Sequence, residues 1–184
     1  MAVNAALGGK AIIDIKTYTS RYMPAHLECR HSPYSIEQLF DLVADVEKYS
    51  EFLPWIHSCR IVERWPDKVS VDMALGLGPL KQNFHSRAVL ERPHRIEISS
   101  DDPPFEWFRQ RWQFAADAAG AVIEYSYDFR LHSQLLEHIS STLLDEGVRA
   151  TIDAFEQRAR HVYGDRGSNP THRDAAAAAG FLQH

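Results

Sequence analysis

Residues 68–90 read KVSVDMALGLGPLKQNFHSRAVL, and their alternation is the clearest indication of the architecture. Apolar residues occupy every second position over residues 69–77, and a second alternating run covers residues 80–90. A period of two is typical of a strand with one buried face and one wet face. Gly78-Pro79 separates the two runs and predicts a turn. The stretch therefore predicts two consecutive antiparallel strands.

Further strands are predicted on the C-terminal side of this stretch. Ile96 and Ile98 mark a short strand, and residues 108–114 mark another. A turn follows at residues 117–120, and alternation resumes over residues 123–131. Consecutive strands joined by short turns predict an antiparallel meander with one apolar face.

Helical patterns flank the predicted sheet. After a short strand at residues 26–30, Ser35 and Gln38 have the spacing of a capping box, which predicts a helix beginning after Ser35. Residues 49–55 predict a second short helix or turn. At the other end, apolar residues recur with a helical period over residues 134–162. The pattern predicts an α+β fold in which a curved antiparallel sheet wraps around a long C-terminal helix.

The chain of 184 residues is long enough for one domain with a cavity inside its core. We predict that residues 23–164 form this domain, that residues 1–22 are a poorly ordered extension, and that residues 165–184 are a disordered or weakly helical tail. The formal net charge of −5 argues against a general nucleic-acid binder. The two cysteines form no CxxC motif, which fits a reducing compartment.

Several blocks of sequence resemble the coenzyme Q-binding START-domain family of the polyketide cyclase/dehydrase superfamily. The longest block, YSIEQLFDLVADVEKY, covers residues 34–49 and is followed by FLPW at residues 52–55. Shorter matches include Trp112-Gln113-Phe114 and the closing block at residues 154–159. The resemblance extends from about Met23 to Gly164.

This resemblance implies a helix-grip, START-like fold with an apolar tunnel between the sheet and the C-terminal helix. It implies a non-catalytic protein that binds ubiquinone or a related polyprenyl lipid and supports respiration or quinone synthesis. It also implies a cytoplasmic location peripheral to the inner membrane, or on the matrix side in a mitochondrion. Some relatives are described as ribosome-association toxins that bind the large ribosomal subunit, which is the main alternative. A cyclase or hydrolase acting on an apolar substrate is a third.

Aromatic side chains and the helix stripe provide the candidate tunnel lining. An apolar lining with aromatic faces suits a quinone ring. The predicted lining residues are Trp55, Phe84, Phe105, Trp112, Tyr125, Tyr127, Phe129, Val148, Ile152 and Phe155. Gln82 and Gln110 lie in phase with the apolar positions of their strands, so a ligand carbonyl or a trapped water could bind their amides.

A separate group of residues is the candidate ligand entrance. The segment at residues 49–56 concentrates aromatic and aliphatic side chains and contains a proline, which limits its regular structure. Tyrosine and tryptophan suit a membrane interface because one end of each side chain is apolar and the other tolerates water. The predicted entry and membrane-contact residues are Tyr49, Phe52, Leu53, Pro54 and Trp55, although core packing beneath the first helix is the slightly better explanation for Phe52 and Leu53.

Catalytic and metal-binding patterns are sparse. No HExxH, GxSxG or glycine-rich phosphate motif occurs. His57 and Cys59 lack a second ligand pair, and Asp41 and Asp45 are better explained as a solvated helix face than as an acid–base pair. We therefore predict no catalytic residue, no metal and no required cofactor, with ubiquinone as the bound ligand.

Overall fold

The computed structural model describes residues 26–77, 80–132 and 141–165. Within these ranges the side chains of residues 77, 80, 131 and 141–148 are not described. The predicted extension at residues 1–22, the turn at Gly78-Pro79 and almost all of the predicted tail lie outside the described residues.

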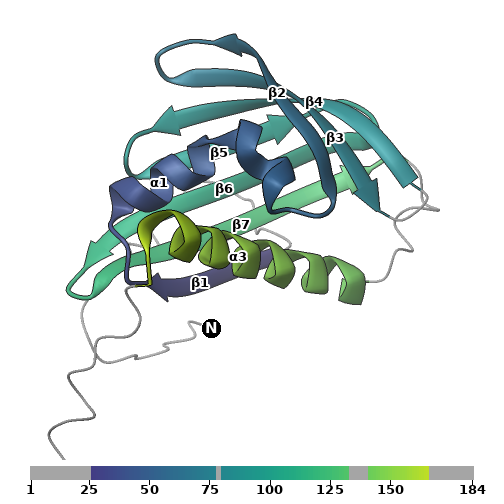
Figure 1. The fold of residues 1–184 in the computed structure, drawn as a ribbon. Coiled ribbons are helices and arrows are strands. Elements are labelled where there is room, and N and C mark those ends of the chain that lie inside the picture. Colours follow the sequence, from purple (N-terminus) through teal and green to yellow (C-terminus); the bar gives the residue numbers. More distant parts are fainter. Residues whose placement is uncertain (1–25, 78–79, 133–140, 166–184) are drawn as a thin grey trace, which may run out of the picture.

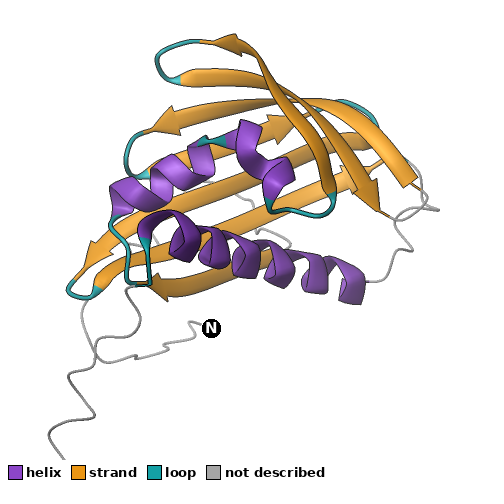
Figure 2. Cartoon of the chain, viewed as in Figure 1, coloured by secondary structure: helices purple, strands orange, loops and turns teal. Residues whose placement is uncertain are grey.

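Seven antiparallel strands form a single curved sheet, and the helices lie on one face of it (Figures 1 and 2). The spatial order is β1-β7-β6-β5-β4-β3-β2, so only the first strand leaves its sequence neighbours and pairs with the last. In chain order the elements are β1 His26–Ser32, α1 Ile36–Ala44, the 3₁₀ helix η2 Val46–Glu51, β2 Ile56–Arg64, β3 Lys68–Leu77, β4 Leu80–Glu91, β5 Arg95–Ser100, β6 Phe105–Asp117, β7 Gly120–Leu131 and α3 Ser141–Tyr163. The predicted fold is confirmed.

Local signals explain where α1 begins. The Ser35 hydroxyl accepts a hydrogen bond from the backbone N–H of Gln38 at 3.3 Å, and the Gln38 side chain accepts one from the backbone N–H of Ser35 at 3.1 Å. This reciprocal pair is the predicted capping box, and it satisfies backbone N–H groups that have no partner inside the helix.

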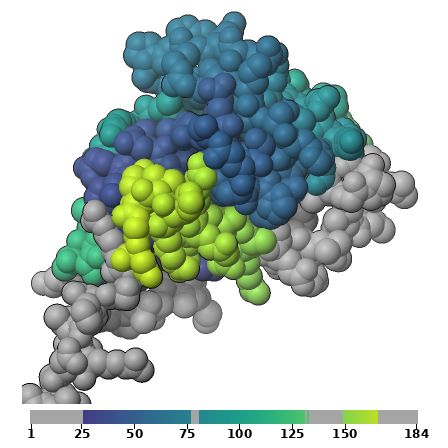
Figure 3. Space-filling view, viewed as in Figure 1, coloured from purple at the N-terminus to yellow at the C-terminus, as the bar shows by residue number. Residues whose placement is uncertain are grey.

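Two tyrosines connect the C-terminal end of α3 to the beginning of α1. The Tyr34 hydroxyl donates to the carbonyl oxygen of Gly164 at 2.7 Å, and the Tyr163 hydroxyl donates to the carbonyl oxygen of Gln38 at 3.0 Å. The space-filling view shows α3 and the α1–η2 segment side by side over the sheet (Figure 3). These contacts fix one end of the long helix relative to the first helix.

Strand β2 has no strand pattern in the sequence and was not predicted. Most of its side chains are exposed, its pairing with β3 has two register irregularities, and it forms one edge of the sheet. A strand with little buried surface need not alternate, so the period-two criterion fails for it. Other elements differ from the prediction at their boundaries. Strand β6 begins at Phe105 and not at residue 108, and the short helix is Val46–Glu51 and not residues 49–55. Residues 134–140 of the predicted long helix lie outside the described part of the chain.

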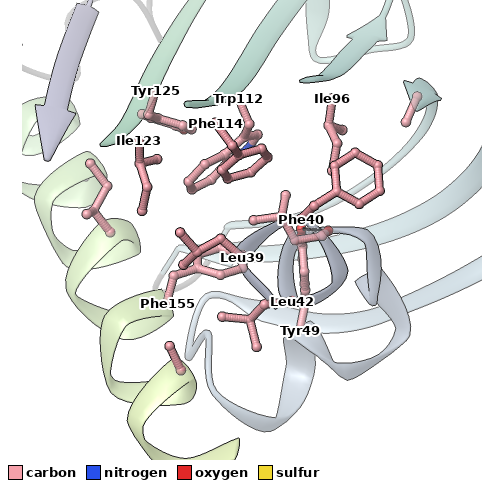
Figure 4. Packing of buried hydrophobic residues seen from close by; sticks show 14 of the residues in the cluster. Leu39, Phe40, Leu42, Tyr49, Ile96, Trp112, Phe114, Ile123, Tyr125 and Phe155 are labelled. Atoms are coloured by element: carbon pink, nitrogen blue, oxygen red, sulfur yellow. Dashed lines mark hydrogen bonds between the residues drawn. The ribbon is translucent and has the colours of Figure 1, made fainter. Parts of the chain in front are cut away.

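The core lies between the helices and the concave face of the sheet. Figure 4 shows Leu39 and Phe155 of the helices directed toward Trp112, Phe114 and Tyr125 of the sheet. Trp112 is only 2% exposed. No helix among the described residues is long and apolar enough to span a bilayer.

Candidate ligand-binding cavity

A cavity of about 220 Å³ lies in this core. Its walls come from α1, from η2 and the residues that follow it up to the first residue of β2, from the inward faces of strands β3 to β7 and from α3. Apolar side chains dominate the lining, and no described lining residue carries a charge. The described lining residues are Val43, Ala44, Val46, Tyr49, Leu53, Trp55, Ile56, Val69, Val71, Met73, Leu75, Phe84, Ser86, Ala88, Leu90, Ile96, Ile98, Phe105, Phe108, Gln110, Trp112, Tyr125, Thr151 and Phe155.

Most of the predicted tunnel residues meet in this lining. Those at the cavity wall are Trp55, Phe84, Phe105, Trp112, Tyr125 and Phe155. Phe84 contacts Phe105 edge to face, with ring centroids 5.3 Å apart. Phe84 follows the inward phase of β4, whereas Phe105 is out of phase with Trp112 in β6 and reaches the cavity beyond a register irregularity between Phe105 and Trp107.

Other predicted tunnel residues lie outside the lining. Tyr127 is buried and stacks on His26 and Phe129, with ring centroids 5.4 Å and 6.0 Å away. Figure 1 shows α3 in front of β7 and β1, so the helix covers this part of the sheet. Ile152 is buried in the same packed region, and the side chain of Val148 is not described.

The aliphatic wall on β3, β4 and β5 was not among the predicted site residues. Its members occupy the inward positions of the alternating strands, including Val71, Met73, Ile96 and Ile98. The alternation identified them as buried, but a buried valine in a packed core and one at a cavity wall have the same sequence pattern.

Few polar groups reach the cavity. Gln110 donates a hydrogen bond from Nε2 to the Tyr125 hydroxyl at 2.9 Å, and the Ser86 hydroxyl donates to the sulfur of Met73 at 3.6 Å. The indole N–H of Trp112 is buried and has no hydrogen-bond partner among the described residues. Gln82, by contrast, is exposed near the beginning of β4, so the prediction that its amide is buried was wrong.

Burial sets the protonation of the nearby hydroxyl and thiol groups. Desolvation raises the pKa of Tyr49 and of Tyr125 well above the ordinary tyrosine value. The same effect raises the pKa of the Cys59 thiol to about 12. All three groups are neutral near pH 7, so none of them is a ready base or nucleophile.

The predicted entry segment borders the cavity. Tyr49, Leu53 and Trp55 belong to the lining, whereas Pro54 is exposed. The Tyr49 hydroxyl donates to the carbonyl oxygen of Val43 at 2.6 Å, which holds the segment against α1. Phe52 does not line the cavity and packs against α3 instead.

The contacts of Phe52 join this segment to α3. Its ring centroid lies 5.1 Å from that of Phe155, and the Arg158 guanidinium lies 5.4 Å from its ring centroid. Arg158 also forms an ion pair with Glu51 at 2.8 Å. One wall of the cavity therefore consists of a short segment held to α3 mainly by side-chain contacts.

Comparisons with known proteins identify the family. Residues 32–156 match the family model described as polyketide cyclase/dehydrase and lipid transport. The chain belongs to this family. The ribosome association toxin RatA of Pseudomonas aeruginosa is 32% identical over 135 residues, which cover 72% of this chain and 92% of that protein. The mitochondrial coenzyme Q-binding protein COQ10 homolog B of Xenopus laevis is 26% identical over 136 residues, 71% of this chain and 56% of that protein.

Solved structures share the fold of this chain. An 18 kDa protein from Caulobacter crescentus is 28% identical with a TM-score of 0.64, and the match covers 76% of this chain and 98% of that one. A START superfamily protein from Mycobacterium smegmatis is 16% identical with a TM-score of 0.65, over 74% of this chain and 97% of that one. The second likeness shows the fold alone. The predicted START-like fold is thus confirmed.

Outside the cavity, the charged residues of this family member largely pair with one another. Asp41 accepts two hydrogen bonds at 2.9 Å from the Arg92 guanidinium on an exposed surface, which agrees with a solvated helix face. Arg109 pairs with Asp101 at 3.1 Å, and Arg111 pairs with Glu97. Among the described residues there is no group of three or more His, Cys, Asp or Glu side chains that could hold a metal ion.

Proposed function

We propose that this protein binds ubiquinone or a related polyprenyl lipid in the cavity and acts as a carrier or chaperone without catalysing a reaction. The observation that carries the proposal is an uncharged, largely apolar and aromatic cavity between the sheet and α3. Burial of apolar surface contributes about 25 cal/mol per Å², so a few hundred Å² of isoprenoid tail supplies several kcal/mol, partly offset by the cost of ordering.

The comparisons support this ligand class. The family description includes lipid transport, and one relative is a coenzyme Q-binding protein. The cavity lining supports a binding role over a catalytic one, because its described members include no carboxylate, histidine or lysine able to exchange a proton near neutral pH. Peripheral contact with a membrane would give such a carrier access to its ligand.

Native mass spectrometry of the full chain, after mild lipid extraction and incubation with ubiquinone, tests the proposal. We expect one quinone per chain. Ala88→Phe places a ring inside the cavity and should abolish the bound mass. Ala74→Phe, the same change on the opposite face of the sheet, should leave it unchanged. Absence of quinone from the wild type, or its equal retention by Ala88→Phe, would contradict the proposal.

A second candidate function is binding to the large ribosomal subunit. It is favoured by relatives named ribosome association toxin, one of which is 32% identical. Cosedimentation with purified large subunits at physiological salt tests it. Binding by both the wild type and Ala88→Phe would assign a ribosomal role to the outer surface and separate it from the cavity.

Trp55→Ala tests whether the ligand enters beside the η2–β2 segment. Trp55 is half-buried at the cavity wall, and its carbonyl oxygen accepts a hydrogen bond from the Gly76 N–H at 2.8 Å, an interaction that alanine retains. We expect quinone exchange with liposomes to slow roughly tenfold, which is about 1.4 kcal/mol on the barrier, with an unchanged far-UV circular dichroism spectrum.

The matched control is Trp65→Ala. Trp65 is 47% exposed and lies outside the cavity lining, so exchange should stay at the wild-type rate. Equal slowing in both variants would indicate a general loss of membrane affinity, and an unaffected Trp55→Ala would place the entrance elsewhere.

A further inference from the structure

The indole N–H of Trp112 is a buried hydrogen-bond donor. Trp112 is 2% exposed and lines the cavity, and its ring lies against Tyr125 and Phe155 at centroid distances of 4.4 Å and 5.1 Å. Its Nε1 has no hydrogen-bond partner among the described residues. An indole nitrogen can only donate, and buried donors in proteins are nearly always satisfied. The acceptor for this group must therefore come from outside the described chain.

Tyr125 supplies a second donor beside the first. It lies directly opposite Trp112 in the β6–β7 register, so both side chains project from the same face of the sheet. The Tyr125 hydroxyl accepts a hydrogen bond from Gln110, which leaves its own proton available to donate to a ligand. Burial raises the pKa of this hydroxyl, so it keeps its proton at neutral pH.

The lining also limits the charge of the acceptor. No described lining residue is a lysine, arginine or histidine, so a carboxylate in the cavity would lose its hydration without a cationic partner. A carbonyl oxygen is neutral and has two lone pairs, one for each donor. A saturated or isoprenoid hydrocarbon has no lone pair and could accept a hydrogen bond from neither donor.

We propose that Trp112 and Tyr125 form a two-donor site for a neutral carbonyl oxygen, so that the cavity selects a quinone or ketone headgroup over a hydrocarbon or a fatty acid. This inference rests on the proposed binding of a neutral lipid. Gln110 is a positioning residue, because its amide fixes the Tyr125 hydroxyl through the hydrogen bond at 2.9 Å.

Calorimetric titration of the full chain with three probes tests the selectivity. Decylubiquinone has the carbonyl headgroup, decylbenzene has the same tail on a ring without an acceptor, and decanoate has a charged headgroup. We expect the wild type to bind decylubiquinone most tightly and decanoate least. Tyr125→Phe and Trp112→Phe should each weaken decylubiquinone roughly tenfold, the order of one or two hydrogen bonds, and change decylbenzene affinity less than about twofold.

Tyr34→Phe is the matched control for removal of a hydroxyl. Tyr34 is buried, but its hydroxyl bonds to Gly164 and it does not line the cavity, so the affinity ratio of the two aromatic probes should stay at the wild-type value. If Tyr125→Phe loses equal affinity for decylubiquinone and decylbenzene, these residues contribute only apolar surface to the cavity, and the inference is overturned.

The two proposals fail in different ways. If the wild type binds decylbenzene as tightly as decylubiquinone, the lipid-binding function stands and the carbonyl site does not. If it binds neither, the proposed function itself fails. Infrared spectroscopy of the wild-type complex needs no variant: hydrogen bonding should lower the quinone carbonyl stretching frequency below its value in hexane, and an unshifted band would also overturn the inference.

Discussion

Gly120→Ala is expected to lower the free energy of unfolding by roughly 4 kcal/mol. Gly120 has φ of 147°, and a Cβ at this position would lie 2.3 Å from the carbonyl oxygen of Ser32. The estimate combines backbone strain of about 1–3 kcal/mol with steric displacement of similar size. Because the obstructing atoms belong to the backbone at the end of β1, relief requires that the β1–β7 pairing shift.

Gly120→Ala should also disturb the contacts of α3. Arg30 of β1 forms an ion pair with Asp153 of α3 at 3.0 Å, so a displaced β1 disturbs a contact of the helix that closes the cavity. Urea denaturation measures the loss. Gly164→Ala is the control, because Gly164 has φ of 80° but nothing within 4 Å of an added Cβ. It should cost only about 1–2 kcal/mol from strain. Equal losses would show that the approach to Ser32 is unimportant.

Phe155→Ala should lower the free energy of unfolding by about 3–5 kcal/mol, the usual range for a buried phenylalanine. Phe155 is 6% exposed and makes edge-to-face contacts with Tyr49 and Trp112 at 5.3 Å and 5.1 Å between centroids. It also lines the cavity, so part of its surface faces space and not packed atoms. We therefore expect a stability loss near 3 kcal/mol, together with weaker quinone binding.

Phe114→Ala separates the loss of stability from the loss of quinone affinity. Phe114 is 3% exposed, stacks on Trp112 with centroids 6.4 Å apart and lies outside the cavity lining. It should lose stability like a packed core residue and keep wild-type quinone affinity in the folded protein. Urea denaturation gives the unfolding midpoint of each variant. Quinone titrations at urea concentrations below those midpoints give the affinities of the folded proteins. If Phe155→Ala binds quinone as tightly as Phe114→Ala does, Phe155 belongs to the ordinary core.

Local sequence patterns predicted some elements of the fold and not others. The alternation of β3, β4 and β7 predicted their faces and their antiparallel neighbours, and the capping box predicted the beginning of α1. These features depend on residues close together in the chain, where periodicity and hydrogen-bond chemistry act directly. Strand β2 lacked such a signal because its place in the sheet depends on pairing with β3 rather than on a buried face of its own.

For the candidate site, strand and helix periods by themselves determined the inward direction of Phe84, Trp112, Tyr125 and Phe155. Only the tertiary structure decided which inward-facing residues reach the cavity. Tyr125 and Tyr127 have the same phase in β7, yet Tyr125 lines the cavity and Tyr127 packs against His26. The difference arises from where α3 crosses the sheet. Whether the Trp112 N–H has a partner among the described residues likewise depends on neighbours from separate strands and from α3. Periodicity specifies a face, whereas an unfilled volume depends on how several faces meet.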